Sequence, residues 1–126
     1  MYLRFEIKGE LPTLNEYSRA ERTSKYHGNN VKQTAQEMIM RQIPKVETIS
    51  EHVFVYFTWI RSNARFDKDN VSFAKKFILD ALQERKIIIR DSWRKVTPID
   101  RDFLVNARNP RTVVEISSER LDEWKN

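Results

Sequence analysis

The chain contains no cysteine among its 126 residues. This absence excludes a disulfide framework and any metal site built on thiolates, and it is compatible with a reducing compartment. The chain also has no stretch that approaches the roughly 18 consecutive apolar residues of a membrane-spanning helix, and it has no repeats or low-complexity tracts. We therefore expect a cytoplasmic protein that does not associate with a membrane.

Length and charge narrow the class of protein further. A chain of 126 residues is typical of one domain, and we expect a single domain over residues 1–126. Lysine and arginine together outnumber aspartate and glutamate by 23 to 18, which gives a formal net charge of +5. An excess of positive charge favours an anionic partner such as a nucleic acid, without identifying it.

Apolar patterns predict several strands. Alternating apolar residues over 3–7 predict a first strand, and the almost wholly apolar run over 53–60 predicts a central strand that is covered on both faces. Two more strands are expected over 96–105 and 112–117, joined by a turn-rich connection. Pro98 places the earlier of these two strands near an edge or a bulge. The pattern therefore predicts an α/β (α+β) fold with a mixed sheet of four to five strands.

The same sheet is expected to pack with two main helices. Their predicted ranges are 30–42, where Pro44 ends the amphipathic pattern, and 71–84. A short helix is predicted over 119–126. Residues 11–28 are polar and carry several basic side chains, so we expect a long, partly ordered basic segment there.

Asp67 and Asp69 stand where the central strand hands over to the second predicted helix. Their carboxylates should converge at a sheet edge, where functional sites are common. Carboxylate oxygens suit Mg²⁺ or Mn²⁺, and two of them held together repel each other unless a cation lies between them. The alternative is that one aspartate caps the helix and the other interacts with the helix dipole. An EF-hand does not fit, because its loop glycine and its glutamate at the twelfth position are absent.

A helical wheel with about 100° per residue brings Asp69, Lys76 and Asp80 to within about 40° of one another. The apolar residues of the predicted helix fall on the opposite side, namely Val71, Ala74, Ile78, Ala81 and Leu82. Lys75 lies roughly 100° from Lys76, so the wheel favours Lys76 as the lysine that accompanies the acidic residues. The alternatives are that Lys76 is a solvated surface lysine and that Asp80 is a hydrogen-bonded structural residue.

The order of four motifs along the chain resembles the RusA family of Holliday junction resolvases. These motifs are Leu11-Pro-Thr-Leu-Asn-Glu-Tyr, Asp67-Lys-Asp-Asn, Lys75-Lys-Phe-Ile-Leu-Asp-Ala-Leu and Asp91-Ser-Trp. The resemblance covers most of the chain, and its most specific part is the D-x-D-N motif with L-D-A-L downstream.

The resemblance implies an activity and a set of site residues. Members of the family are small homodimeric endodeoxyribonucleases, often of prophage origin, that resolve four-way DNA junctions by paired symmetric nicks with Mg²⁺ or Mn²⁺. Their essential residues fall by position on Asp67, Asp69, Asp91 and Lys76, with the three aspartates as metal ligands. Asn70 and Asp80 are expected to support these residues. The assignment of Asp91 to the site depends on the resemblance alone, because the spacing of Asp91 from the predicted helix does not place it near the other two aspartates.

The chain departs from the best-known member of the family at two places. Lys76 follows Asp69 by seven residues, an interval longer by three, but both intervals return to the same face of a helix. Arg90 also replaces an acidic neighbour of the third aspartate, which we expect to alter metal affinity or pH dependence.

Basic and aromatic residues complete the expected DNA contacts. Phosphate contacts are expected from Arg19, Arg22, Lys25, Arg61, Arg65, Lys68 and Lys75, each of which is alternatively a surface charge. Tyr17, Phe66 and Trp93 are candidates for stacking on unpaired bases, with packing in the core or an interface as the alternative. Two rival functions stay open: a nuclease for other branched DNA, and a noncatalytic DNA-binding prophage protein in which the aspartates only cap a helix.

Overall fold

Four strands form one mixed sheet in the computed structural model, which describes residues 1–121. In chain order they are β1 (Tyr2–Lys8), β2 (Val53–Arg61), β3 (Val96–Val105) and β4 (Arg111–Ser117). Their spatial order is β1-β4-β2-β3, with β4 antiparallel to both β1 and β2 and with β2 parallel to β3. The fold is thus a single α+β domain with a four-stranded mixed sheet, as the sequence predicts.

The four predicted strands agree closely with the structure. The alternation in β1 buries Phe5 and Ile7, and β2 lies inside the sheet as expected for an apolar strand. β3 is an edge strand that contains Pro98, and its register with β2 shifts between Phe57 and Thr58. Proline and a register shift are both typical of an edge strand, because they interrupt further backbone pairing.

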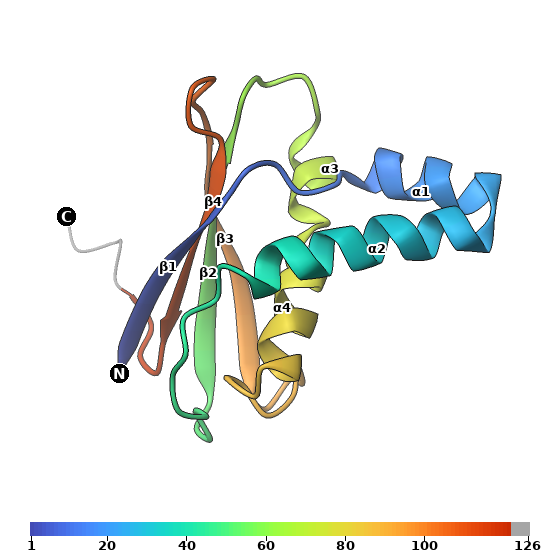
Figure 1. Ribbon diagram of the computed structural model, residues 1–126. Coiled ribbons are helices and arrows are strands. Elements are labelled where there is room, and N and C mark those ends of the chain that lie inside the picture. The colour runs from blue at the N-terminus through green and yellow to red at the C-terminus, as the bar shows by residue number, and fades with distance from the viewer. Residues whose placement is uncertain (122–126) are drawn as a thin grey trace.

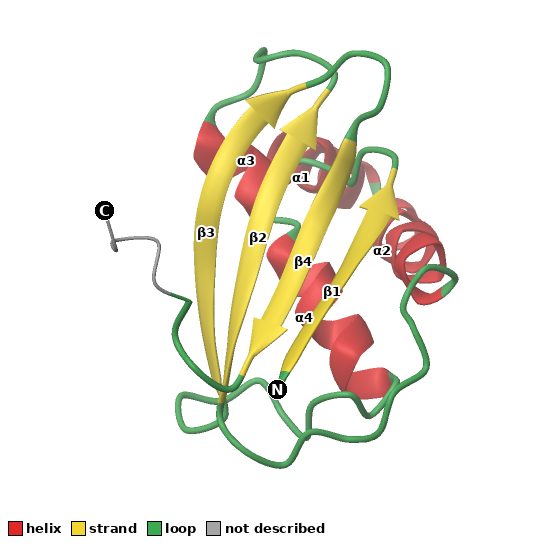
Figure 2. Cartoon of the chain, turned by 90° about the vertical axis from the view of Figure 1, so that its left-hand side faces the viewer, coloured by secondary structure: helices red, strands yellow, loops and turns green. Residues whose placement is uncertain are grey.

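All helices lie on one face of this sheet, behind the strands in the view of Figure 2. The helices are α1 (Leu14–Thr23), α2 (Lys25–Met40), the short α3 (Lys68–Ser72) and α4 (Lys75–Glu84). The core between the two layers includes Ile39 of α2, Val55 and Phe57 of β2, and Ile78 and Leu82 of α4. The helices meet only one face of β2, so the prediction that β2 is covered on both faces holds on the other face only in part, where Tyr56 and Ile60 are buried.

The other face of the sheet is covered locally by the chain that follows β4. Tyr56 of β2 is fully buried on this face, and its hydroxyl accepts a 2.7 Å hydrogen bond from the backbone N–H of Leu121. The guanidinium groups of Arg101 and Arg120 lie over the rings of Tyr56 and Phe54. Long side chains and a short segment thus take the place of a second layer.

Within residues 11–28, residues 14–23 and 25–28 are helical, so the prediction of a partly ordered segment is wrong. Thr13 and Glu16 form a capping box at the start of α1, and Ser24 caps α2. α2 therefore begins five residues before its predicted start. Gly28 lets the two helices pack closely, because a Cβ there would lie 2.7 Å from Cγ of Glu21. The resulting hairpin of α1 and α2 projects away from the sheet (Figure 1).

The predicted helix over 71–84 begins earlier, at Lys68, and is interrupted after Ser72. Ala74, Lys76 and Phe77 each donate their backbone N–H to the residue three positions earlier, which winds the chain more tightly than an α-helix. The predicted helix over 119–126 lies mostly outside the described residues. Within residues 1–121, no helix is long and apolar enough to cross a membrane.

Candidate metal and nucleic-acid site

Asp67 occupies the N-cap position of α3, directly after the loop that leaves β2. Its backbone is extended, with φ −60° and ψ 154°, yet its carboxylate makes no capping hydrogen bond. Asp69 lies in the first turn of the same helix, and both side chains are exposed. Asp67 is therefore at the position where an aspartate usually caps a helix, but its oxygens are left available for another partner.

Asn70 connects this helix to the N-terminal motif. Its side-chain oxygen accepts a 2.9 Å hydrogen bond from the backbone N–H of Asn15, in the first turn of α1. Two of the four motifs that carry the resemblance, around residues 11–17 and 67–70, are thus neighbours in space. Asn70 holds the start of α1 against α3, a role that spacing alone does not indicate.

The two adjacent lysines have different surroundings. The Nζ of Lys75 lies 2.8 Å from a carboxylate oxygen of Asp100 on β3, and the other oxygen of Asp100 accepts a hydrogen bond from the indole of Trp59. Lys76, which the wheel favours, is exposed, and no hydrogen bond or ion pair joins it to Asp67 or Asp69 among the described residues. The wheel assumes one uniform helix, whereas the tight turns before α4 change the phase of both lysines.

Asp91 lies at the opposite end of the sheet from Asp67. Its backbone N–H donates to the side-chain oxygen of Gln83, at the end of α4, and it precedes the start of β3. About 20 Å of helical rise separates Asp69 from Gln83. Within residues 1–121, no three acidic or histidine side chains are grouped so that they could hold a metal ion. One chain therefore does not bring Asp91 to the other two aspartates.

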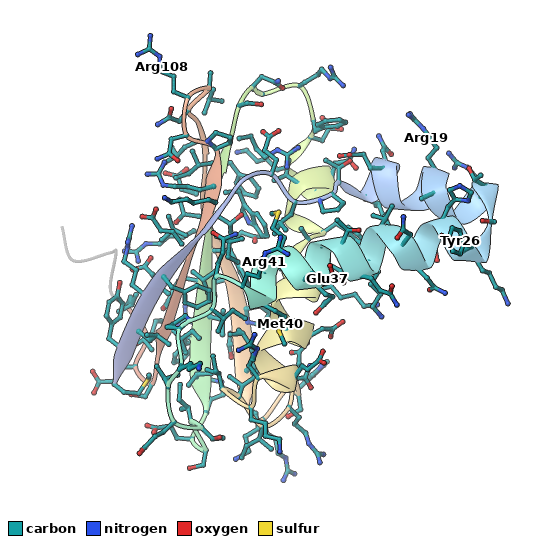
Figure 3. The ribbon with its side chains drawn as sticks, in the orientation of Figure 1. Arg19, Tyr26, Glu37, Met40, Arg41 and Arg108 are labelled. Atoms are coloured by element: carbon teal, nitrogen blue, oxygen red, sulfur yellow. The ribbon has the colours of Figure 1, made fainter. Side chains whose placement is uncertain are left out.

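A polar cavity of about 430 Å³ opens between the start of α1 and the loop that follows β2. Three of the predicted phosphate-binding residues line it: Arg19, Arg61 and Arg65. Arg19 projects from α1 on the side away from α2 (Figure 3). The cavity also has Asn15 and Asn63 in its lining; Asn15 belongs to the N-terminal motif, and the sequence predicts no contact for either residue. Arg61 and Arg65 stand six and two residues before Asp67, and together with Arg19 they give the cavity cationic donors that suit the phosphates of a nucleic acid.

Glu10 fixes one wall of this cavity. The backbone N–H and the hydroxyl of Ser62 donate hydrogen bonds of 2.6 and 2.8 Å to its carboxylate, and Arg61 lies 3.6 Å away. Burial by itself raises the pKa of Glu10, but the two hydrogen bonds and the charge of Arg61 outweigh burial and hold the pKa below its usual value. The charged form of Glu10 therefore connects the end of β1 to the end of β2.

The other predicted contacts are spread over the molecule. Arg22 and Lys25 lie at the turn of the α1–α2 hairpin, apart from the cavity, and the ammonium of Lys68 lies over the ring of Phe103. Asp80 is half-buried on α4. Among the aromatic candidates, Tyr17 packs against Phe73 and Phe77, and Phe66 packs against the core, whereas Trp93 is fully exposed.

No model of a known protein family matches the chain, and a search of curated proteins found no match either.

Proposed function

We propose that this protein is a metal-dependent endodeoxyribonuclease of the RusA type that cuts branched DNA, with four-way junctions as its preferred substrate. The observation that carries the proposal is the carboxylate of Asp67, which stands at a helix N-cap without capping, next to Asp69 and the arginine-lined cavity. DNA cleavage fits the cytoplasmic location that the sequence predicts. The proteins of the family that the chain resembles are often of prophage origin.

Asp67 and Asp69 would hold Mg²⁺ or Mn²⁺. Their exposed carboxylates are hard oxygen donors that suit either ion, and their proximity in sequence favours a cation between them. A divalent cation bound there supplies Lewis acidity toward the attacking water and the leaving 3′ oxygen of a phosphodiester. The protein contributes two carboxylates on a short helix whose start is held against α1 by Asn70.

The arginines position the substrate. Arg19 and Arg65 take part in no ion pair among the described residues, so their charges are available for phosphate oxygens. Arg61 donates to the carbonyl oxygen of Leu11 and also supports the cavity wall. In this arrangement a DNA strand in the cavity presents the next phosphate to Asp67. Lys76, exposed on α4, supplies positive charge near the scissile phosphate.

A homodimer accounts both for paired nicks in a junction and for the distance between Asp91 and the other two aspartates. Paired nicks in a junction with approximate two-fold symmetry need two matched sites, and each chain has one Asp67–Asp69 pair. Asp91 lies too far from that pair within its own chain, so in the dimer each site takes its third carboxylate from the Asp91 of the second copy.

The proposal is tested by incubating the protein and Mg²⁺ with three labelled DNAs: a four-way junction, a Y-fork and a linear duplex. We expect paired nicks in the junction and little cleavage of the duplex. Preferred cleavage of the Y-fork would favour the rival branched-DNA nuclease. Junction binding without any nicking, unchanged in Asp67→Asn, would instead favour a noncatalytic DNA-binding protein and would overturn the proposal.

A further inference from the structure

Trp93 is the most exposed large apolar side chain of the described residues. It is 100% exposed in the segment between α4 and β3, whereas Trp59 is 2% exposed in the core. Ile89, in the same segment, is 50% exposed. An exposed tryptophan leaves a large apolar surface in water, and such residues are typical anchors of protein interfaces.

An apolar groove lies at the other end of β3. It has a volume of about 270 Å³, and its lining includes Trp59, Phe66, Phe103, Leu104 and Val105. Leu104 and Val105 are 46% and 57% exposed, so the groove continues into an open apolar edge. Asp67 belongs to the same lining. The groove is therefore directly beside the carboxylate pair.

These two features lie at opposite ends of the same edge strand. β3 begins three residues after Trp93 and ends at Val105, and in the described part of the chain no other strand covers its outer edge (Figure 2). A two-fold axis beside the middle of β3, perpendicular to the strand, places the β3 strands of two copies antiparallel. The start of β3 in one copy then lies beside the end of β3 in the other. Under that symmetry, each copy presents one exposed tryptophan to the groove of the other, which gives a closed, self-complementary interface.

We propose that Trp93 of each copy docks into the groove at the end of β3 in a second copy of this chain. The charge of the groove is mixed, because its lining carries Arg61 and Lys68 as well as Asp67, so the apolar contact of the indole directs the docking. Pro98 and the adjacent register shift disfavour pairing of the two β3 backbones, so side chains make the contact.

The docking gives the proposed nuclease its third carboxylate, and in this respect it rests on the proposed function. Asp91 is two residues from Trp93, and Asp67 lines the groove that receives Trp93. A docked Trp93 therefore brings Asp91 to the carboxylate pair of the other copy.

The absence of cysteine makes cross-linking a clean test. Two single variants, Trp93→Cys and Leu104→Cys, are mixed and treated with a short bis-maleimide linker, which compensates for the lost length of the indole. We expect a covalent dimer in the mixture and much less with either variant alone. Tyr26→Cys mixed with Leu104→Cys is the matched control, because Tyr26 is also exposed, at the far end of the hairpin (Figure 3). Cross-linking of Trp93→Cys with itself, or equal yields in the control, would overturn the proposal.

Sedimentation supplies a second readout that needs no cleavage of DNA. We expect the wild type and Tyr26→Ala to be dimers and Trp93→Ala to be a folded monomer with an unchanged circular-dichroism spectrum, since a fully exposed side chain does not pack in the core of its own chain. A dimeric Trp93→Ala, or a monomeric wild type at all concentrations, would contradict the docking. A wild-type dimer without nuclease activity would refute the proposed function and leave the docking intact.

Discussion

The indole N–H of Trp59 donates a 2.9 Å hydrogen bond to Asp100, across two parallel strands of the sheet. The second oxygen of Asp100 lies 2.8 Å from Nζ of Lys75, so one carboxylate satisfies both a core tryptophan and a helix lysine. This contact fixes α4 over the edge strand. It also explains why Lys75 is directed to the sheet and Lys76 to solvent.

Loss of this carboxylate should destabilise the fold. Asp100→Ala leaves the N–H of buried Trp59 without its acceptor, and we expect the free energy of unfolding to fall by about 1–3 kcal/mol. Asp100→Asn keeps an acceptor for the indole and should cost less. Urea unfolding of the two variants measures the difference, and equal losses would show that the indole hydrogen bond contributes little.

Lys86→Gly should stabilise the protein. Lys86 has a φ angle of 59°, in the left-handed region. The backbone N–H groups of Lys86 and Ile87 donate to the carbonyl oxygens of Gln83 and Leu82, which ends α4 in a Schellman motif. A residue with a Cβ is strained in this conformation, whereas glycine is not. After the greater entropy of unfolded glycine is subtracted, we expect a gain of about 0.5–1 kcal/mol. Thermal unfolding checks this, with Lys86→Ala as the control that keeps the strain.

Glu10 should make the free energy of unfolding depend on pH. Its pKa in the folded protein lies below the ordinary value of 4.5, so its stabilising effect is complete above that pH and is lost as the pH falls through the folded pKa. Wild type should therefore exceed Glu10→Gln in stability at pH 7, with the difference shrinking toward pH 3. Urea unfolding at both pH values measures it, and a difference that does not change with pH would contradict this role.

The elements that could be predicted from sequence are those whose pattern is local. Alternation in β1 and apolar content in β2 reveal these strands without any knowledge of their neighbours. The order that separates β3 from β4 depends on long-range pairing, which no local pattern contains. α1 is an intermediate case, because Thr13 and Glu16 form a readable capping box, but the polar composition around them favours a loop.

The residues of the site also divide into those that a local sequence pattern reveals and those that depend on the packing of distant segments. The sequence places Asp67 and Asp69 at a strand end and identifies the arginines that line the cavity beside them. It cannot place Asp91, whose position depends on the length of α4 and on the sheet register. The surroundings of Lys75 and Lys76 likewise depend on two tight turns that a uniform wheel does not represent.

A mixing experiment should reveal whether each site is shared between two chains. Asp67→Asn and Asp91→Asn should each be inactive alone, whereas a mixture that exchanges subunits should recover about a quarter of the sites, because half of the dimers contain one complete site. The recovered activity should nick only one strand of a junction. Asp67→Asn mixed with Asp69→Asn should stay inactive, and an inactive first mixture would contradict the sharing of each site between two chains.

The central claim is that Asp67 and Asp69 form a metal site for cutting DNA, and the Mg²⁺ dependence of junction nicking tests it most directly. Wild type should nick opposite strands with Mg²⁺ and should be inactive in chelator. Asp69→Asn should be slower by about 100-fold or more while its melting temperature is unchanged, because the exposed side chain makes no hydrogen bond or ion pair within residues 1–121. Full activity of Asp69→Asn, or full activity of wild type in chelator, would contradict the metal site.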